Sequence, residues 1–385
     1  MKPLEFSLVE GGPLYRVARW AGLSPAPRGL YQIALILAAI AWVPLLVLNA
    51  VQGSVTGGSA VPFEWSLGTH TRFLVTIPMF FAAEAYFDRR ARQALSHMLD
   101  SGLVPPSEMR GFAAALRRAV RWRDSVLIEV ALFALTGLLI LSGVRTDLPV
   151  AESTWRAVSG RVTPAGWWYS VVALPIFQFL SWRWCWRLLV WWVLLWRVAR
   201  LDLRLMPTHP DRAGGLGGLG VAHTNLAPLS LGVSAMLAAT YGEDLLFGGM
   251  TLDSLVLPLA GIVLGTLALT LTPLLFFMPR LVACKQRGLI EYGVLAATYA
   301  RAFDAKWLRG GAAPDEPLLG SGDIQSLADL ANSFGVIRSM LPVPFAIYQA
   351  VLLAGAALVP MLPLLLTVIS MNELIVRSVR SLVGL

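Results

Sequence analysis

The chain has 385 residues, of which 56% are hydrophobic and only 14% are charged, and its formal net charge is +8. Soluble domains carry about a quarter charged residues, so this composition excludes an ordinary soluble protein and favours a membrane bundle. A basic chain can also bind nucleic acid. Here, however, the arginines and lysines collect in alternate loops, which is typical of membrane topology.

These observations predict an integral membrane protein that binds membrane lipids, and neither nucleic acid nor a nucleotide. Arginine greatly outnumbers lysine, which suggests a GC-rich bacterial genome and hence a bacterial inner (cytoplasmic) membrane. The basic residues before the first apolar stretch place the N-terminus in the cytoplasm. The two cysteines, Cys185 and Cys284, would then lie in the membrane or on its cytoplasmic side, where a structural disulfide is not expected.

Apolar stretches of about 20 residues predict an all-α fold, a polytopic transmembrane helical bundle with about eight spans (seven to eight) and helical cytoplasmic extensions. The predicted segments are a cytoplasmic N-terminal segment at 1–29, transmembrane helices 1 and 2 at 30–87, a cytoplasmic helical hairpin at 88–124, transmembrane helices 3 to 6 at 125–278, cytoplasmic helices at 279–340 and a C-terminal transmembrane hairpin at 341–385. We find no internal repeat.

Within 125–278, residues 165–205 are expected to form one long, tryptophan-rich helix. Trp167 and Trp168 precede the group at 182–186 by about 22–28 Å at the helical rise of 1.5 Å per residue, so the two groups resemble the aromatic belts of a membrane. A bend at Arg183–Arg187 is the alternative, but no helix-breaking residue occurs there. The part beyond the membrane would need a cover, either from other helices of the chain or from another subunit. A homo-oligomer is expected as well, because symmetry-related copies could supply partners for the polar face of the C-terminal helix.

The C-terminal region has two interpretations. A hairpin would run outward over Leu341–Pro360, turn at Pro360 and Pro363, and return with Glu373 and Arg377 on one face. A single kinked span is possible, but it would put the terminal arginines on the wrong side of the membrane.

A glycine-rich cytoplasmic loop at 206–225 contains a literal G-x-G-x-x-G at Gly215, Gly217 and Gly220. A dinucleotide site also needs a preceding strand and an acidic residue about 20 positions later, and both are missing. We therefore expect tight turns and close packing at the glycines, with Asp211 capping a helix. The candidate polar residues of this loop are His209, Asp211 and Arg212, and two possible ligands do not make a metal site.

The string T-H-P-D-R-A-G-G-L-G at Thr208–Gly217 resembles a loop found in uncharacterised bacterial polytopic membrane proteins. The pattern P-L-L-L-T…E-L-I at Pro363–Ile375 is similar to their C-terminal ends. The resemblance implies a polytopic membrane fold and no specific activity.

Charged residues at membrane depth are costly in lipid and are therefore candidate functional groups. Six of them are expected in one layer near the inner surface: Glu84, Glu129, Arg183, Arg187, Glu373 and Arg377. Near the outer surface, Arg72 can meet Glu243 or Asp244. The layer is either a set of salt bridges that orients the helices or a polar passage with charged constrictions.

Motifs for hydrolases, metalloproteases and nucleotide-binding enzymes are missing from the sequence, so we expect no enzyme and no cofactor. The main expectation is a transport protein, channel-like or carrier-like, that conducts an ion or small polar solute along a path lined by the C-terminal helix. The alternative is a non-transporting sensor, scaffold or assembly factor that binds anionic lipid or a cytoplasmic partner.

Overall fold

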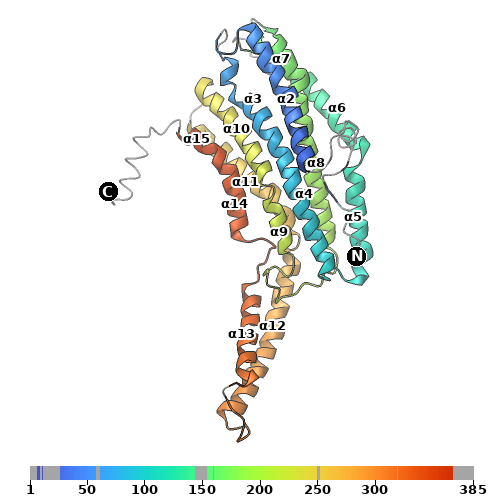
Figure 1. Ribbon diagram of the computed structural model, residues 1–385, viewed down its shortest axis with the longest axis vertical. Coiled ribbons are helices and arrows are strands. Elements are labelled where there is room, and N and C mark those ends of the chain that lie inside the picture. Colours follow the sequence, from blue (N-terminus) through green and yellow to red (C-terminus); the bar gives the residue numbers. More distant parts are fainter. Residues whose placement is uncertain are drawn as a thin grey trace, which may run out of the picture.

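The computed structural model describes residues 7–8, 11, 27–57, 61–143, 154–158, 160–248, 252–318 and 320–366. The expected all-α fold is confirmed. Two short strands, β1 (Ala157–Val158) and β2 (Arg161–Val162), pair in one antiparallel turn, and helices make up the rest of the regular structure in these residues. The helices form an elongated bundle, and a two-helix arm projects from one end of it (Figure 1).

The first half of the bundle is built from long helices that run along its axis. Its elements are α2 (Pro27–Gln52), η1 (Phe63–Trp65), α3 (Leu67–Thr71), η2 (Arg72–Thr76), α4 (Ile77–Asp100), η3 (Pro106–Glu108), α5 (Met109–Arg123), α6 (Val126–Gly143), α7 (Pro164–Trp168), η4 (Tyr169–Ala173) and α8 (Leu174–Ala199). Helix α4 packs against α2, and α8 packs against α5 and α6.

The second half completes the bundle and forms the arm. Its elements are α9 (Gly217–Thr224), α10 (Ala227–Phe247), α11 (Leu252–Leu275), α12 (Met278–Phe303), η5 (Asp304–Leu308), α13 (Gly322–Ser339), α14 (Ile347–Leu358), η6 (Val359–Met361) and α15 (Leu362–Leu366). Helices α9 and α10 pack against α4, and α14 packs against α10 and α11. We call α12, η5 and α13 the arm, the end of the bundle that bears it the basic end, and the opposite end the far end (Figure 1).

Four helices of the described chain are long and apolar enough to cross a membrane, which supports an integral membrane protein. They are Gly29–Gln52, Gly217–Phe247, Ser254–Leu275 and Ile347–Leu364. The expectation of eight spans is therefore wrong by this measure. The predicted second and fourth spans do form helices, but α3–α4 and α7–α8 carry ionisable groups such as Arg72, Glu84 and Arg187, which lower their apolar character. The predicted third span forms α6 and includes a shorter apolar helix over Val126–Leu139.

Helices α4 and α8 share a local repeat that the sequence analysis missed. The strings V-T-I-P-M-F at 75–80 and V-A-L-P-I-F at 172–177 each begin with the last two residues of a widened π-helical turn, η2 or η4. Proline has no N–H to donate, so an irregular turn before Pro78 and Pro175 accommodates it. Equivalent positions meet in space, because the Phe80 and Phe177 rings stack with centroids 5.9 Å apart.

The long tryptophan-rich helix is continuous from Pro164 to Ala199, without the alternative bend at Arg183–Arg187. It ends at Ala199, short of the expected residue 205. Helix α5 covers the part of α8 that was expected to protrude, because Phe112, Ala115 and Ala119 are buried on that side of the chain. The cover therefore comes from another helix of the same chain, the first of the two expected alternatives.

The arm forms from the predicted helices at 279–340. Helix α13 packs along α12 and not against the bundle, and the Tyr299 hydroxyl donates to the carbonyl of Asp323 at 3.1 Å. Beyond the arm, the helix over Ile347–Leu364 continues through Pro360 and Pro363. The chain therefore does not reverse at these prolines. Of the returning helix predicted over Leu362–Leu382, the part from 367 onward lies outside the described residues.

Candidate functional site

A buried ion pair joins α4 to α8 in the middle of the bundle. The Arg187 guanidinium donates to the carboxylate of Glu84, and Arg183 Nη1 lies 3.6 Å from the same Glu84 oxygen. The side chains of Glu84, Arg183 and Arg187 are only 2%, 4% and 3% exposed. Two arginines one turn apart on α8 thus face one carboxylate on α4, as expected for part of the charged layer.

The other members of the predicted layer are not brought into this cluster by the described contacts. Glu129 lies on α6 in the wall of an open cavity of about 670 Å³ between α6, α8 and Leu37 of α2, and it is the one charged residue among the lining residues. Glu373 and Arg377 lie outside the described residues.

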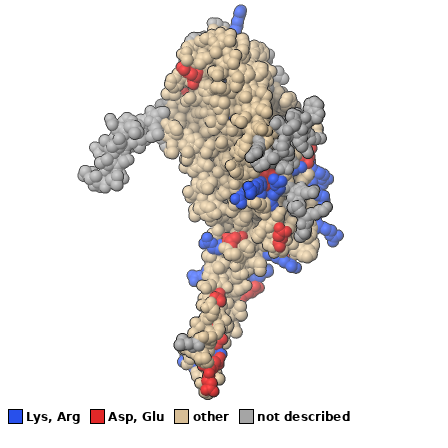
Figure 2. All heavy atoms as spheres, in the orientation of Figure 1, with Lys and Arg blue, Asp and Glu red and all other residues tan. Residues whose placement is uncertain are grey.

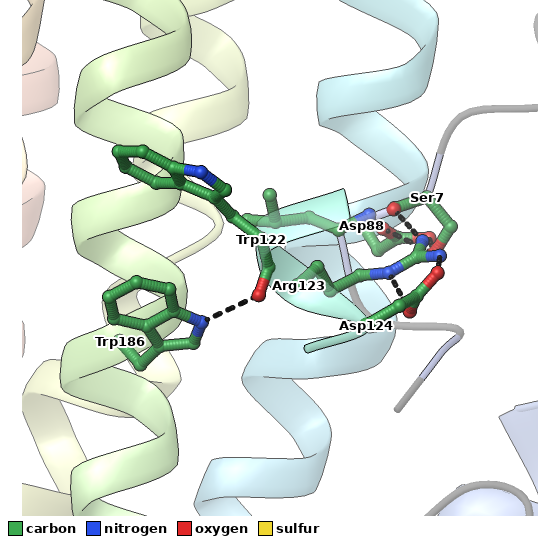
Figure 3. Close-up of polar contacts among 7 residues, drawn as sticks. Ser7, Asp88, Trp122, Arg123, Asp124 and Trp186 are labelled. Carbon is green, nitrogen blue, oxygen red and sulfur yellow. Dashed lines mark hydrogen bonds and ion pairs between the residues drawn. The ribbon is translucent and has the colours of Figure 1, made fainter. Parts of the chain in front are cut away.

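A second polar cluster lies one helical turn further along α4 and holds the N-terminal segment (Figure 3). Asp88, which is 3% exposed, accepts hydrogen bonds from the Ser7 hydroxyl at 2.9 and 3.0 Å and from the Leu8 N–H at 2.6 Å. Arg92 pairs with the same carboxylate at 2.9 Å. From α5, Arg123 donates to the carbonyl of Ser7. The cluster therefore fixes a short N-terminal stretch against α4 and α5.

The sequence analysis missed this cluster because Asp88 begins a stretch that it assigned to a solvated hairpin. His223 was not among the residues singled out from the sequence. His223 is 1% exposed, and its Nε2 accepts from Trp191 Nε1 at 2.9 Å while its Nδ1 faces the carbonyl of Thr270. These partners require a neutral ring with the proton on Nδ1. Neither site has a sequence signal, since each depends on helices distant in the chain.

The expected outer ion pair between Arg72 and Glu243 or Asp244 is not formed. Arg72 donates to the Tyr169 hydroxyl and lies 5.5 Å from the centroid of the Phe177 ring. Glu243 instead accepts the N–H of Gly68 at the start of α3. The N-terminal N–H groups of a helix lack intrahelical partners, so a carboxylate is a favourable acceptor there. Arg72 and Glu243 therefore lie at the same end of the bundle, but their direct hydrogen-bond partners are other residues.

The glycine-rich loop organises the junction between the bundle and the arm. The Asp211 carboxylate accepts from the N–H groups of Ala213 at 2.8 Å, Gly215 at 3.1 Å and Gly217 at 2.8 Å, and the last of these begins α9. His209 Nδ1 lies 2.7 Å from the same carboxylate. Asp211 thus caps α9, as predicted. It lies six residues before Gly217, the first residue of the helix, and not directly next to it.

The glycines of the motif permit this compact turn. Gly214 and Gly215 have φ angles of +64° and +98°, in the left-handed region that favours glycine. A Cβ on Gly220 would lie 2.3 Å from the carbonyl oxygen of Pro344, so only glycine fits that contact. Arg212 also has a positive φ of 55°, and its carbonyl accepts from Leu341 N–H at 2.7 Å. The loop fills its own space with protein contacts, which is a structural use of the glycines.

Comparison with known proteins assigns the chain to no group: no protein-family model, no curated protein and no solved structure matches it.

Glu84→Gln should destabilise the protein strongly, because two buried arginines would then face a neutral amide. Removing one partner of a buried ion pair costs about 3–5 kcal/mol. Thermal unfolding of the purified protein in detergent, followed by tryptophan fluorescence, measures the change. Glu291→Gln, at an exposed position of α12, is the control and should leave the transition in place. A Glu84→Gln protein with the wild-type transition would contradict a stabilising role for this pair.

The stability of the glycine-rich loop should depend on pH through the carboxyl group of Asp211. Burial alone would raise the pKa of Asp211, but the N–H groups of Ala213, Gly217 and Gly215 and the His209 ring hold this pKa below its ordinary value. A lowered folded-state pKa gives stability that is complete above the unfolded pKa of about 4 and is lost as pH falls toward the folded pKa.

The measurement is the unfolding temperature from pH 7 to pH 3 for wild type and Asp211→Asn. The variant should have the lower unfolding temperature at pH 7. Below about pH 4 its unfolding temperature should change less with pH than that of wild type, because the titrating carboxyl group is gone. Parallel curves for the two proteins would contradict the role of Asp211.

Proposed function

We propose that the protein is a non-transporting membrane scaffold or sensor whose basic end binds anionic phospholipid headgroups and whose arm presents a surface to a cytoplasmic partner. The main support is an arginine-rich face on α5 that lies beside the tryptophans of α8. Because arginine presents a planar fork of donors that matches phosphate oxygens, it suits a phosphodiester ligand.

Helix α5 separates apolar and basic residues onto opposite sides. Its apolar side, with Phe112, Ala115 and Ala119, is buried against the bundle. Its other side carries four exposed arginines, and two more lie exposed on the neighbouring stretch of α4. We call this set the arginine belt: Arg89, Arg90, Arg110, Arg117, Arg118 and Arg121. Figure 2 shows basic side chains gathered where the bundle approaches the arm.

Aromatic side chains mark the level at which a lipid headgroup would meet this belt. The Arg118 guanidinium lies 5.1 Å from the centroid of the Trp122 ring, which stacks on Trp186 with centroids 5.9 Å apart. Trp186 Nε1 donates to the carbonyl of Trp122 at 3.2 Å, so α5 and α8 are tied together at this height (Figure 3). Tryptophan is enriched at membrane–water interfaces, and anionic lipids attract basic residues close to the membrane surface.

The arm supports the second part of the proposal. It extends away from the bundle and exposes large apolar side chains, among them Ile290 and Val294 at 69% and 63%. At its tip, Lys306 bridges Glu316 at 2.5 Å and Asp323 at 2.9 Å, which closes the connection between α12 and α13. An exposed apolar stripe with polar neighbours is a common feature of surfaces that bind other proteins.

The belt also sets the proposed orientation. Basic residues concentrate on the cytoplasmic side of membrane proteins, so the basic end and the N-terminus face the cytoplasm of a bacterial inner membrane in this proposal. A homo-oligomer remains compatible with it, but α5 already covers the tail of α8.

Transport is the second candidate, and the buried ion pair between Glu84 and the two arginines favours it. Charges at such depth occur in the pathways of channels and carriers. Liposomes containing the purified protein should then pass a common monovalent ion, and Glu84→Gln should change the flux. Absence of flux for Na⁺, K⁺, H⁺ and Cl⁻ would contradict this candidate.

Loss of the arginine belt should weaken the preference for anionic lipid. Wild type should be stabilised more by phosphatidylglycerol than by phosphatidylcholine in mixed micelles. The phosphate of phosphatidylglycerol keeps its negative charge for the belt, whereas the positive choline of phosphatidylcholine balances it. The variant Arg117→Gln/Arg118→Gln/Arg121→Gln should lose most of this difference in unfolding temperature. A matched control removes three basic residues from the arm, Arg287, Arg301 and Arg309, and should keep it. Equal stabilisation by both lipids in wild type would contradict the proposal.

A further inference from the structure

The far end of the bundle contains a small pocket with charges of both signs. It has a volume of about 180 Å³ and lies between the end of α10 and the segment before β1. Arg156 forms part of one wall, while Glu243 and Asp244 form part of another. Trp155 and Phe247 supply apolar surface. Figure 2 shows acidic side chains at this end of the molecule.

The charged groups line the same pocket without a direct ion pair between Arg156 and either carboxylate in the described residues. Among the described residues, Arg156 and Asp244 form no ion pair within 4.0 Å, and the Arg156 guanidinium lies over the rings of Trp155 and Tyr169 at 5.8 and 5.4 Å. Glu243 is occupied by the Gly68 N–H. The Thr154 hydroxyl is buried and has no hydrogen-bond partner in the part of the chain that the structure describes. Buried polar groups usually have partners, so this set has unused capacity for a ligand.

The arrangement discriminates between ligand classes. A simple anion would be attracted by Arg156 but repelled by two carboxylates and by the carbonyl end of α10, where the helix dipole is negative. A simple cation would meet the opposite conflict at Arg156. A ligand that carries both charges satisfies each wall, with its carboxylate on Arg156 and its ammonium group on Asp244.

We infer that this pocket binds a small zwitterion of the α-amino acid class at the far end of the bundle. The pocket volume corresponds to about six water molecules at roughly 30 Å³ each, which suits a ligand about the size of glycine or alanine. The Thr154 hydroxyl supplies a third polar contact, and Trp155 and Phe247 enclose a short side chain. Such a site goes beyond lipid binding at the basic end and does not depend on it.

Calorimetric titration of the full-length protein in detergent tests the inference. The probes are L-alanine and glycine, with methylamine as a cation and acetate as an anion of similar size. We expect both zwitterions to bind, and each singly charged compound to bind at least about tenfold more weakly, because it loses one charge-assisted hydrogen bond. The inference would be overturned if neither zwitterion bound at concentrations up to about 10 mM, the range of weak metabolite affinities. Equal binding of methylamine and the zwitterions would overturn it as well.

Variants locate the site. Asp244→Asn and Arg156→Gln should each weaken alanine binding about tenfold, and Thr154→Val should weaken it less, since a neutral hydrogen bond is lost. Asp202→Asn is the matched control, because Asp202 lies near the basic end with a side chain 90% exposed. Unchanged affinity in both charge variants would overturn the assignment. If either fails to fold, Thr154→Val and the four-probe comparison on wild type still decide the question, and the lipid preference is measured separately.

Discussion

The contact on which the bundle depends is the buried pairing of Glu84 with Arg187 and Arg183. Charges in an apolar interior are tolerated only when they face one another. This pairing therefore fixes the rotation of α4 and α8 about their axes and their axial position relative to each other. The next turn of each helix adds a further specific contact. Asp88 on α4 holds Ser7 and Leu8, and Trp191 on α8 donates to His223 on α9. A column of polar contacts thus sets the relative positions of helices whose remaining contacts are apolar and less selective.

The sequence predicted the all-α class, the continuous tryptophan-rich helix, the two helices of the arm and the meeting of Glu84 with the arginines of α8. These features follow from local periodicity or from the cost of burying charge. It overestimated the number of apolar spans because it accepted stretches that contain Arg72 or Glu84. It could not find the partners of Asp88, His223 or Arg72, because each contact joins helices separated along the chain by loops whose path no local pattern specifies.

The two ends of the bundle differ in chemistry, and this difference organises the functional proposals. The basic end combines arginines, tryptophans and a projecting arm, which suits contact with anionic lipid headgroups and a protein partner. The far end has a small pocket of mixed charge instead. Helices α3–α4 and α10 reach from one end toward the other, so a ligand bound between Arg156 and Asp244 would contact the same helix, α10, that packs against α4 beside the buried ion pair.

The proline-linked turns of α4 and α8 have a consequence for which side-chain changes the two helices can accept. Equivalent positions of the two segments are in contact. Phe80 stacks on Phe177, and Arg72, at the start of one π turn, donates to Tyr169, at the start of the other. Such pairing joins equivalent positions of the two helical segments. A change of ring size at Phe80 therefore acts directly on Phe177, its own counterpart, and a compensating change would have to be made there.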